Sequence, residues 1–226
     1  KWELLIGAQK TFSSDSPVSG SGEHAFDTTL YSPPIAMSWR ALVGVGQSNA
    51  TFNDDPLRNR WAKAGVQWRN GSTTIEASLI SQHYGYGQKT GALSSFEYAL
   101  DDAWTLGGSL AWRGQATPLR ALANNISANN VQAWVRWAPN SEREWMFSVS
   151  PSRFSDGNRR VELRLAGKEP LKKWSTVRLD GEIDISASTN TKDNAPYYNP
   201  KADLGVLAGV RVTHLITQRY ESRLEH

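Results

Sequence analysis

Three carboxylates follow one another at every second position in the stretch RLDGEIDISAS, residues 178–188. They are Asp180, Glu182 and Asp184, and the apolar side chains that alternate with them are Leu179, Ile183 and Ile185. Successive side chains of a β-strand point to opposite faces, so this spacing predicts one acidic and one apolar face. Like charges on one face repel each other. The three must therefore be offset by cations or used to attract a cationic ligand.

More charged residues occupy the polar positions of other alternating stretches. The carboxylates that we assign to the same face are Asp27, Glu76, Glu97, Glu144 and Glu162. The cations are Arg40, Lys63, Arg69, Arg113, Arg136, Arg160, Arg164, Arg178 and Arg211. Opposite charges on neighbouring strands stabilise a sheet modestly. Each carboxylate could thus either line the path of a charged ligand or only shape a polar wall.

Two tryptophans, Trp61 and Trp134, share this polar face. An indole has a broad apolar face and one polar N–H. Inside a polar channel such a ring is suited to stacking on sugar rings. The alternative is that both rings pack against the wall.

Bond-making chemistry finds little support in the sequence. There is no cysteine and there are four histidines, which excludes thiolate chemistry. Motifs for a nucleophilic serine, a phosphate loop, a zinc peptidase and a calcium loop are absent. Net charge is +3 with singly spread basic residues, so we expect no nucleic-acid partner. We predict a protein that is not an enzyme and holds no metal or cofactor.

The elements that carry these residues are β-strands, because apolar and polar residues alternate along almost the whole chain. We count about twelve strands of about 9–11 residues, the length of a tilted membrane strand. Asn70-Gly71 predicts a type I′ hairpin between two of them. A fragment of a further strand is expected at 219–223.

Two architectures put apolar residues on one face of each strand. In a soluble β-sandwich the apolar faces meet inside; in a membrane barrel they face lipid. Connections alternate between short turns and longer stretches near 53–59, 84–91, 114–128 and 188–203, as in outer-membrane barrels. Aromatic residues gather at strand ends, among them Tyr31, and predict interfacial girdles. We therefore predict an all-β, transmembrane, antiparallel up-and-down β-barrel that residue 1 enters from the periplasm.

Four stretches carry a more specific signal: TPLRALANNISANN at 117–130, SRFSDGN at 152–158, YGYGQKTG at 84–91 and PYYNPKAD at 196–203. Together they resemble the C-terminal outer-membrane barrel of poly-β-1,6-N-acetyl-D-glucosamine exporters of the PgaA type. The Tyr-Tyr-Asn-Pro stretch is shared in looser form with cellulose exporters.

The resemblance implies an integral protein of the Gram-negative outer membrane with about sixteen barrel strands. Its cargo would be partially deacetylated poly-β-1,6-N-acetyl-D-glucosamine, a biofilm matrix polymer. Its partners would be outer-membrane lipid, a periplasmic tetratricopeptide region of the same protein and a periplasmic deacetylase. We assign residues 1–223 to a barrel that is incomplete at its C-terminal end, and interpret 224–226 as a purification-tag remnant.

The two long loops at 114–128 and 188–203 are expected outside the cell, where they would shape or partly close the exit. The residues that we assign to this gate are Pro118, Arg120, Asn124, Asn125, Tyr197 and Tyr198. Deletion of 188–203 should then raise ion conductance. Two other functions remain open: a general diffusion porin or cellulose-type channel, and a barrel enzyme. An enzyme would need a serine–histidine pair facing lipid, for which only His83 and His214 are candidates.

Overall fold

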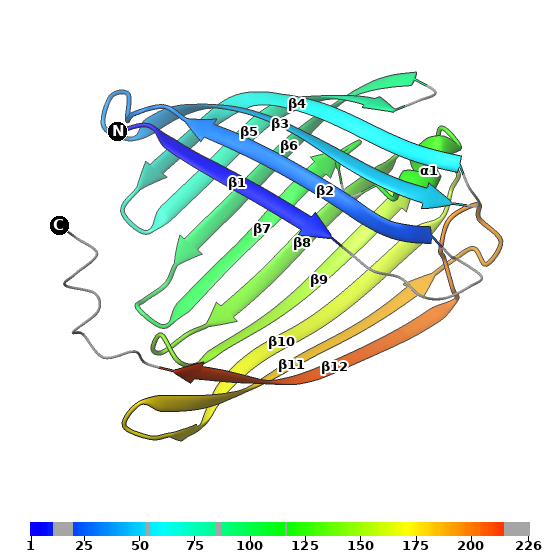
Figure 1. The fold of residues 1–226 in the computed structure, drawn as a ribbon. Coiled ribbons are helices and arrows are strands. Elements are labelled where there is room, and N and C mark those ends of the chain that lie inside the picture. The colour runs from blue at the N-terminus through cyan, green and yellow to red at the C-terminus, as the bar shows by residue number, and fades with distance from the viewer. Residues whose placement is uncertain (11–19, 53–54, 85–86, 116, 215–226) are drawn as a thin grey trace.

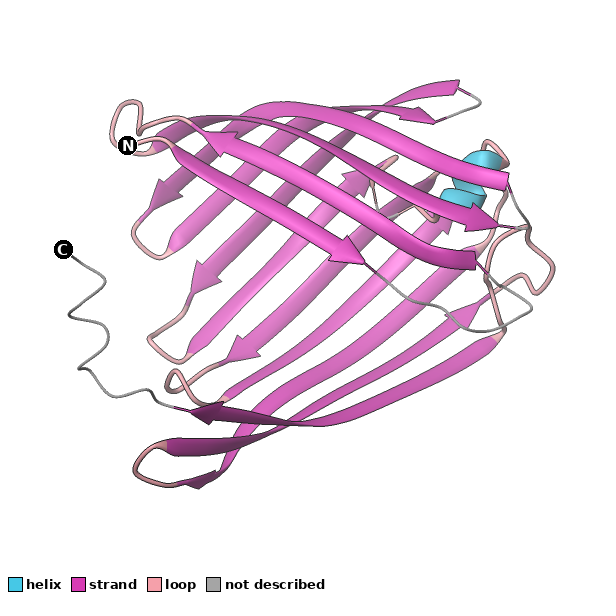
Figure 2. Cartoon of the chain, viewed as in Figure 1, coloured by secondary structure: helices cyan, strands magenta, loops and turns pink. Residues whose placement is uncertain are grey.

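One antiparallel sheet dominates the structure, a computed structural model that describes residues 1–10, 20–52, 55–84, 87–115 and 117–214 (Figure 1). Its strands are β1 (Glu3–Lys10), β2 (Gly20–Tyr31), β3 (Trp39–Phe52), β4 (Asp55–Asn70), β5 (Thr73–Tyr84), β6 (Gly87–Ala99), β7 (Trp104–Trp112), β8 (Ala128–Trp137), β9 (Glu144–Phe154), β10 (Arg159–Lys173), β11 (Val177–Asn190) and β12 (Ala202–His214). One short helix, α1 (Leu119–Ala123), lies between β7 and β8. Figure 2 shows how fully strands make up the fold.

Each strand pairs with its neighbours in the sequence, in the order β1 to β12. The sheet curls into a trough with β1 and β12 at its edges, and these two strands do not pair in the described part of the chain (Figure 1). The up-and-down topology is confirmed. The predicted strand fragment at 219–223 and residues 224–226 lie outside the described residues.

Cross-strand register carries one face continuously around the sheet. Glu3 pairs with Tyr31, Tyr31 with Leu42, Arg40 with Gln67, and Gln67 with Glu76. These residues lie on the concave side, which we call the inner wall. The residues between them form the outer face.

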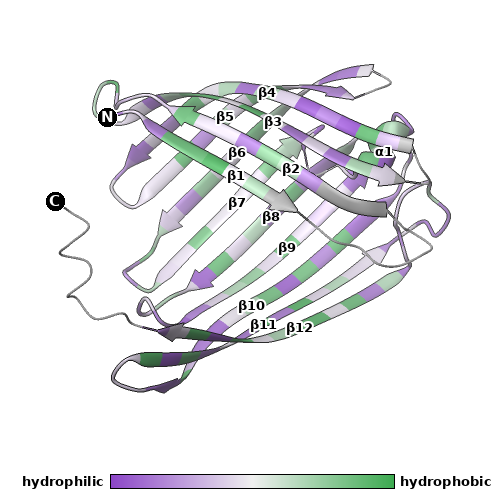
Figure 3. Cartoon of the chain, in the orientation of Figure 1, coloured by the Kyte–Doolittle hydropathy of each residue, from purple (hydrophilic) through white to green (hydrophobic). Residues whose placement is uncertain are grey.

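Apolar side chains cover the outer face and are exposed there. Ile6 is 64% exposed, Leu79 66% and Val206 64%. The alternation of hydrophobic and hydrophilic residues along the strands is visible in Figure 3. A soluble sandwich would bury such residues, whereas an apolar belt of this extent suits contact with lipid hydrocarbon. Among the described residues no helix has the length and hydrophobicity to cross a membrane.

Several strands are longer than predicted, and two expected loops are wrong. β3 and β4 pair as far as Phe52 with Asp55, and β5 and β6 as far as Tyr84 with Gly87. Most of the ranges 53–59 and 84–91 is therefore strand. The reason is physical: above the bilayer both faces of a strand can be polar, so the alternation that marks a membrane strand fades.

The turn after β4 also differs from the prediction. Asn70 pairs with Thr73, so Gly71 and Ser72 form the loop, and Gly71 has a φ of 53°. A type I′ turn at Asn70-Gly71 would need a positive φ at Asn70 as well, and Asn70 is not among the positive-φ residues. The hairpin is confirmed, but the turn lies one residue later.

Candidate functional site

The three alternating carboxylates of β11 lie on the inner wall, and each has a guanidinium partner. Arg178 Nε is 2.9 Å from Asp180 Oδ2, Arg211 Nε is 2.8 Å from Glu182 Oε1, and Arg164 binds Asp184. The mutual repulsion expected from the sequence is thus offset by cations on β10, β11 and β12.

Asp180 differs from its two neighbours because it is fully buried. Its Oδ2 accepts the bond from Arg178, and its Oδ1 makes no hydrogen bond with any described residue. A buried carboxylate is tolerated only when it is paired. Arg178 also contacts Glu142 Oε1 at 3.3 Å, so this arginine links the wall to the turn before β9.

The other predicted carboxylates split into paired and unpaired groups. Glu162 Oε2 is 2.8 Å from Arg160 Nη2. Glu76 lies 3.9 Å from Lys63 Nζ and accepts a 3.0 Å hydrogen bond from the hydroxyl of Tyr31.

Glu97 and Glu144 also lie on the inner wall, where they pair in register with Gly107 and Lys168. Neither makes an ion pair of 4.0 Å or less with a described residue. These two carboxylates therefore keep their charge available to a ligand.

Tyr31 corrects another expectation. We predicted it for an interfacial girdle, but it is 8% exposed and lies on the inner wall. Its bond to Glu76 and the guanidinium of Arg40, 5.1 Å above its ring, hold it there. Trp39 and Trp104 do lie outward, each 40–50% exposed, at the end of the sheet that holds the short turns.

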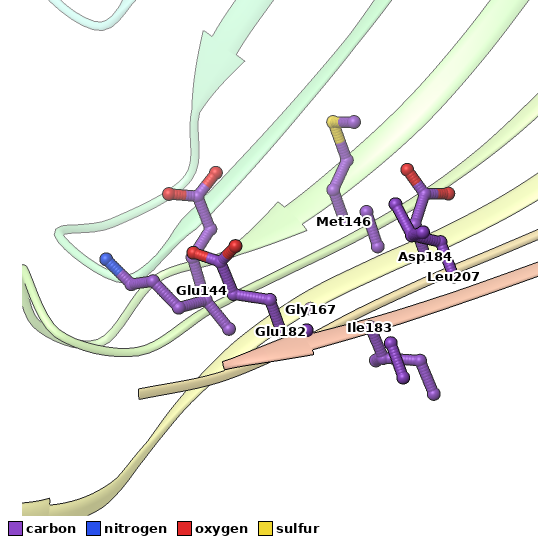
Figure 4. A pocket seen from close by; sticks show the side chains of 11 residues that line it. Glu144, Met146, Gly167, Glu182, Ile183, Asp184 and Leu207 are labelled. Carbon is purple, nitrogen blue, oxygen red and sulfur yellow. The ribbon is translucent and has the colours of Figure 1, made fainter. Parts of the chain in front are cut away.

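A groove of about 380 Å³ lies on the inner wall near the short turns and contains three of the predicted carboxylates (Figure 4). Glu144, Glu182 and Asp184 point into it beside Met146, and Ile183 points to the opposite side. Lys168 is the cation in the lining. The groove therefore presents three carboxylates, of which Glu182 and Asp184 are ion-paired with arginines and Glu144 has no ion pair with a described residue.

At the opposite end of the sheet, two loops meet to form a cap over the inner wall. The first, residues 113–115 and 117–127, contains α1, whose Ala121 and Leu122 are buried and which contacts β4 across the trough. The second, residues 191–201, packs on the first through an apolar cluster of Ala121, Ala128, Phe154 and Tyr197. The rings of Phe154 and Tyr197 stack at 4.8 Å.

A polar hub holds the second loop. Asn158 is fully buried, and its amide nitrogen donates to the Asn190 side chain and the Tyr197 hydroxyl, each at 3.1 Å. Tyr197 donates to Asp156 at 3.2 Å. Burial raises the pKa of Tyr197 to about 12, so its hydroxyl stays a donor at neutral pH. Our sequence reasoning missed Asn158, because nothing in SRFSDGN marks which residue will be enclosed.

The predicted gate residues divide between this cap and its surface. Asn125, with a φ of 59°, accepts bonds from Lys89 and from the hydroxyl of Tyr84, and so ties the first loop to β5 and β6. Asn124 bonds the carbonyl of Arg120, and Pro118 precedes the first residue of α1. Tyr197 is buried, whereas Tyr198 is 48% exposed.

Trp61 and Trp134 also lie on the inner wall, as predicted from alternation. Trp61 pairs with Gly46 and Gln82, and Trp134 with Gly107 and Ser148. Both side chains are partly buried. In the described part of the chain no group of three or more His, Asp or Glu side chains could hold a metal ion.

Several known proteins are similar to this chain in sequence or in structure. Two curated relatives, the poly-beta-1,6-N-acetyl-D-glucosamine export proteins of Escherichia coli strain K12 and Escherichia coli O157:H7, are each 32% identical over 225 residues. The match covers 99% of this chain but only 28% of each relative. This chain thus spans less than a third of the relatives' length.

A solved structure described as a bacterial polysaccharide outer membrane secretin superposes with a TM-score of 0.81 at 30% identity. The match covers 96% of this chain and 73% of that one. The model of the PgaA membrane beta barrel domain matches residues 1–226. The apolar outer face, the charged inner wall and the strand order are those of a barrel in the outer membrane, and the chain belongs to the PgaA membrane β-barrel family.

Proposed function

We propose that this chain forms the membrane part of a channel that exports partially deacetylated poly-β-1,6-N-acetyl-D-glucosamine across the outer membrane for the biofilm matrix. The observation that carries the proposal is an acidic, partly compensated groove on the inner wall of a sheet whose outer face is apolar. The names of the relatives as polymer export proteins support the same cargo.

The wall charges suit a cargo that carries scattered positive charges. Deacetylation exposes amines, which are cationic at neutral pH. Glu144 and Glu97 supply carboxylates without ion-pair partners among the described residues, while the arginine partners moderate Glu182 and Asp184. Coulomb attraction in water is screened over about 8 Å at physiological salt. Many weak contacts would guide the chain without holding it, as conduction requires.

The channel would work as one part of a larger protein. We infer further strands that close the gap between β1 and β12, since an open sheet edge in lipid leaves backbone groups without hydrogen bonds. We also infer a periplasmic tetratricopeptide region of the same protein and a periplasmic deacetylase as partners. The chain itself would catalyse no reaction.

Export by the full-length protein in cells that lack their own exporter tests this function. Wild type should restore surface polymer, and absence of polymer despite normal insertion would refute the proposal. The variant Asp180→Asn/Glu182→Gln/Asp184→Asn should export several-fold less, because three carboxylate charges are lost and the wall becomes more positive. Heat-modifiable migration on gels measures how much barrel is inserted.

The matched control changes the charge of the inner wall in the opposite direction. Arg164→Gln/Arg211→Gln removes the ion pairs of Asp184 and Glu182 and leaves the wall more negative, while Arg178 stays beside the buried Asp180. We expect it to retain export at equal insertion. Equal losses in both variants would show that the pairs act only on the shape of the wall.

A further inference from the structure

Two tryptophans on the inner wall reach over a glycine of the neighbouring strand. Trp61 of β4 pairs with Gly46 of β3, and Trp134 of β8 pairs with Gly107 of β7. A Cβ atom added to either glycine would overlap the six-membered ring of the paired indole, with Cζ2 as its nearest atom. The same arrangement thus occurs twice, on separate parts of the wall.

This arrangement determines how the rings present themselves. An indole that occupies the place of a glycine side chain lies close to the backbone of that strand, on the face of the sheet that lines the interior of the trough. Both tryptophans are partly buried rather than enclosed, as expected for a ring covered on one side. The glycine is needed because any larger residue would lift the ring from the wall.

Hydrogen-bonding side chains surround both rings. Trp134 has Gln132 and Arg136 as its inner-wall neighbours along β8, and Ser148 opposite it on β9. Trp61 has Lys63 along β4, whereas Gln82 opposite it on β5 is buried and already bonded to Asn59 and to the carbonyl of Arg113. An apolar ring beside polar side chains such as Gln132 and Arg136 suits a pyranose, which has apolar C–H faces and hydroxyls around its edge.

We propose that Trp134 on Gly107 and Trp61 on Gly46 form two stacking subsites for the sugar rings of the exported polymer. This inference rests on the proposed function and deepens it. Trp134 lies on β8 between the acidic groove at Glu144 and a second cavity of about 230 Å³ beneath the cap, which Gln132, Asn130 and Arg160 line. The polymer would pass from charged contacts to a stacking contact and then to polar contacts near the exit.

A third tryptophan–glycine pair offers a built-in control. Trp145 of β9 overlaps the place of a side chain at Gly167 of β10 in the same way, but on the outer face. Its Nε1 donates a 2.6 Å hydrogen bond to Glu169. Loss of this ring should leave sugar binding unchanged, because it cannot meet the cargo.

Block of single-channel current by a neutral, fully N-acetylated β-1,6-linked glucosamine oligomer tests the proposal in the full-length protein. A neutral probe removes the contribution of the wall charges. We expect Trp134→Leu or Trp61→Leu to raise the dissociation constant of the oligomer about tenfold, which corresponds to about 1.4 kcal/mol. Trp145→Leu should match wild type. Trp134→Phe, which keeps an aromatic face, should retain most of the affinity.

Gly107→Ala provides a second perturbation, in which residue 134 remains a tryptophan but its ring is displaced. The added methyl overlaps the indole of Trp134, so the ring must move from the wall, and we expect block to weaken as in Trp134→Leu. Unchanged affinity in the leucine variants, at normal insertion and conductance, would overturn the stacking subsites while polymer export by wild type still supports the channel. Wild type that neither exports polymer nor is blocked would overturn both.

Discussion

Moving one lysine by a single residue in β4 tests the assignment of the two faces. Lys63 lies on the inner wall, where its Nζ is 3.9 Å from Glu76 Oε1. Ala64 lies exposed on the outer face, opposite Val43 and Leu79. The double substitution Lys63→Ala/Ala64→Lys keeps composition, length and net charge, and only transfers the ammonium group from one face to the other.

The two halves of this change have very different expected effects. The ion pair has side chains that are 15% and 19% exposed, and its long distance limits its contribution to about 1 kcal/mol or less. A lysine on the lipid face near the bilayer midplane costs about 2–4 kcal/mol, and Ala64 lies near the middle of the 16-residue β4. The outer-face effect should dominate and lower the folding equilibrium constant by about 30-fold to 10³-fold.

Urea unfolding of the full-length protein in lipid vesicles measures these free energies. Lys63→Ala alone should change the free energy of unfolding little, whereas Ala64→Lys alone should account for nearly all the loss in the double variant. If Ala64→Lys proved as stable as Lys63→Ala, the outer face would not lie in hydrocarbon, and the assignment of the faces would be wrong.

Further predictions concern the cap. Tyr197→Ala removes the ring stacked on Phe154, and truncation of a buried aromatic costs about 3–5 kcal/mol. Amide exchange in residues 191–201 should therefore accelerate at least tenfold. Unchanged protection of these amides would contradict the packing of the cap. Replacing 191–201 with a short turn should raise single-channel conductance, and equal conductance would show that the loop does not restrict the exit. Because burial raises the pKa of Tyr197 to about 12, its contribution to cap stability should be complete below pH 10 and lost as pH rises through 12; Tyr197→Phe should abolish that pH dependence in the same exchange assay.

Much of the fold could be predicted from the sequence because a strand's two faces are a local property. Alternation at positions such as Ile183 and Asp184 is enough to assign a side chain to one face of the sheet, and the structure places these two residues on opposite faces. Strand ends were harder to predict. At residues 55–59 both faces lie beyond the apolar belt, so composition resembles a loop although the backbone is paired.

The sequence does not show which cation pairs with each carboxylate of the inner wall. Asp180 pairs with Arg178 of its own strand, Asp184 with Arg164 of β10 and Glu182 with Arg211 of β12. Alternation places all of them on one wall, but only register and side-chain direction select among the cations. Glu144 occupies an alternating polar position like those of the paired carboxylates. The sequence therefore does not show that it has no ion pair with a described residue.

Only the tertiary structure shows how the cap packs and where the rings of the two tryptophans lie. Tyr197 is buried because Phe154, more than 40 residues away, stacks on it. Trp134 reaches over the neighbouring strand because register places Gly107 opposite it, and a shift of two residues would place Thr105 or Ser109 there instead. For most strand residues the alternation in the sequence was enough to separate the outer face from the inner wall, since that follows from a period of two. Which interior residues meet required the pairing of strands distant in the chain, because their contacts depend on how the whole sheet is registered and curved.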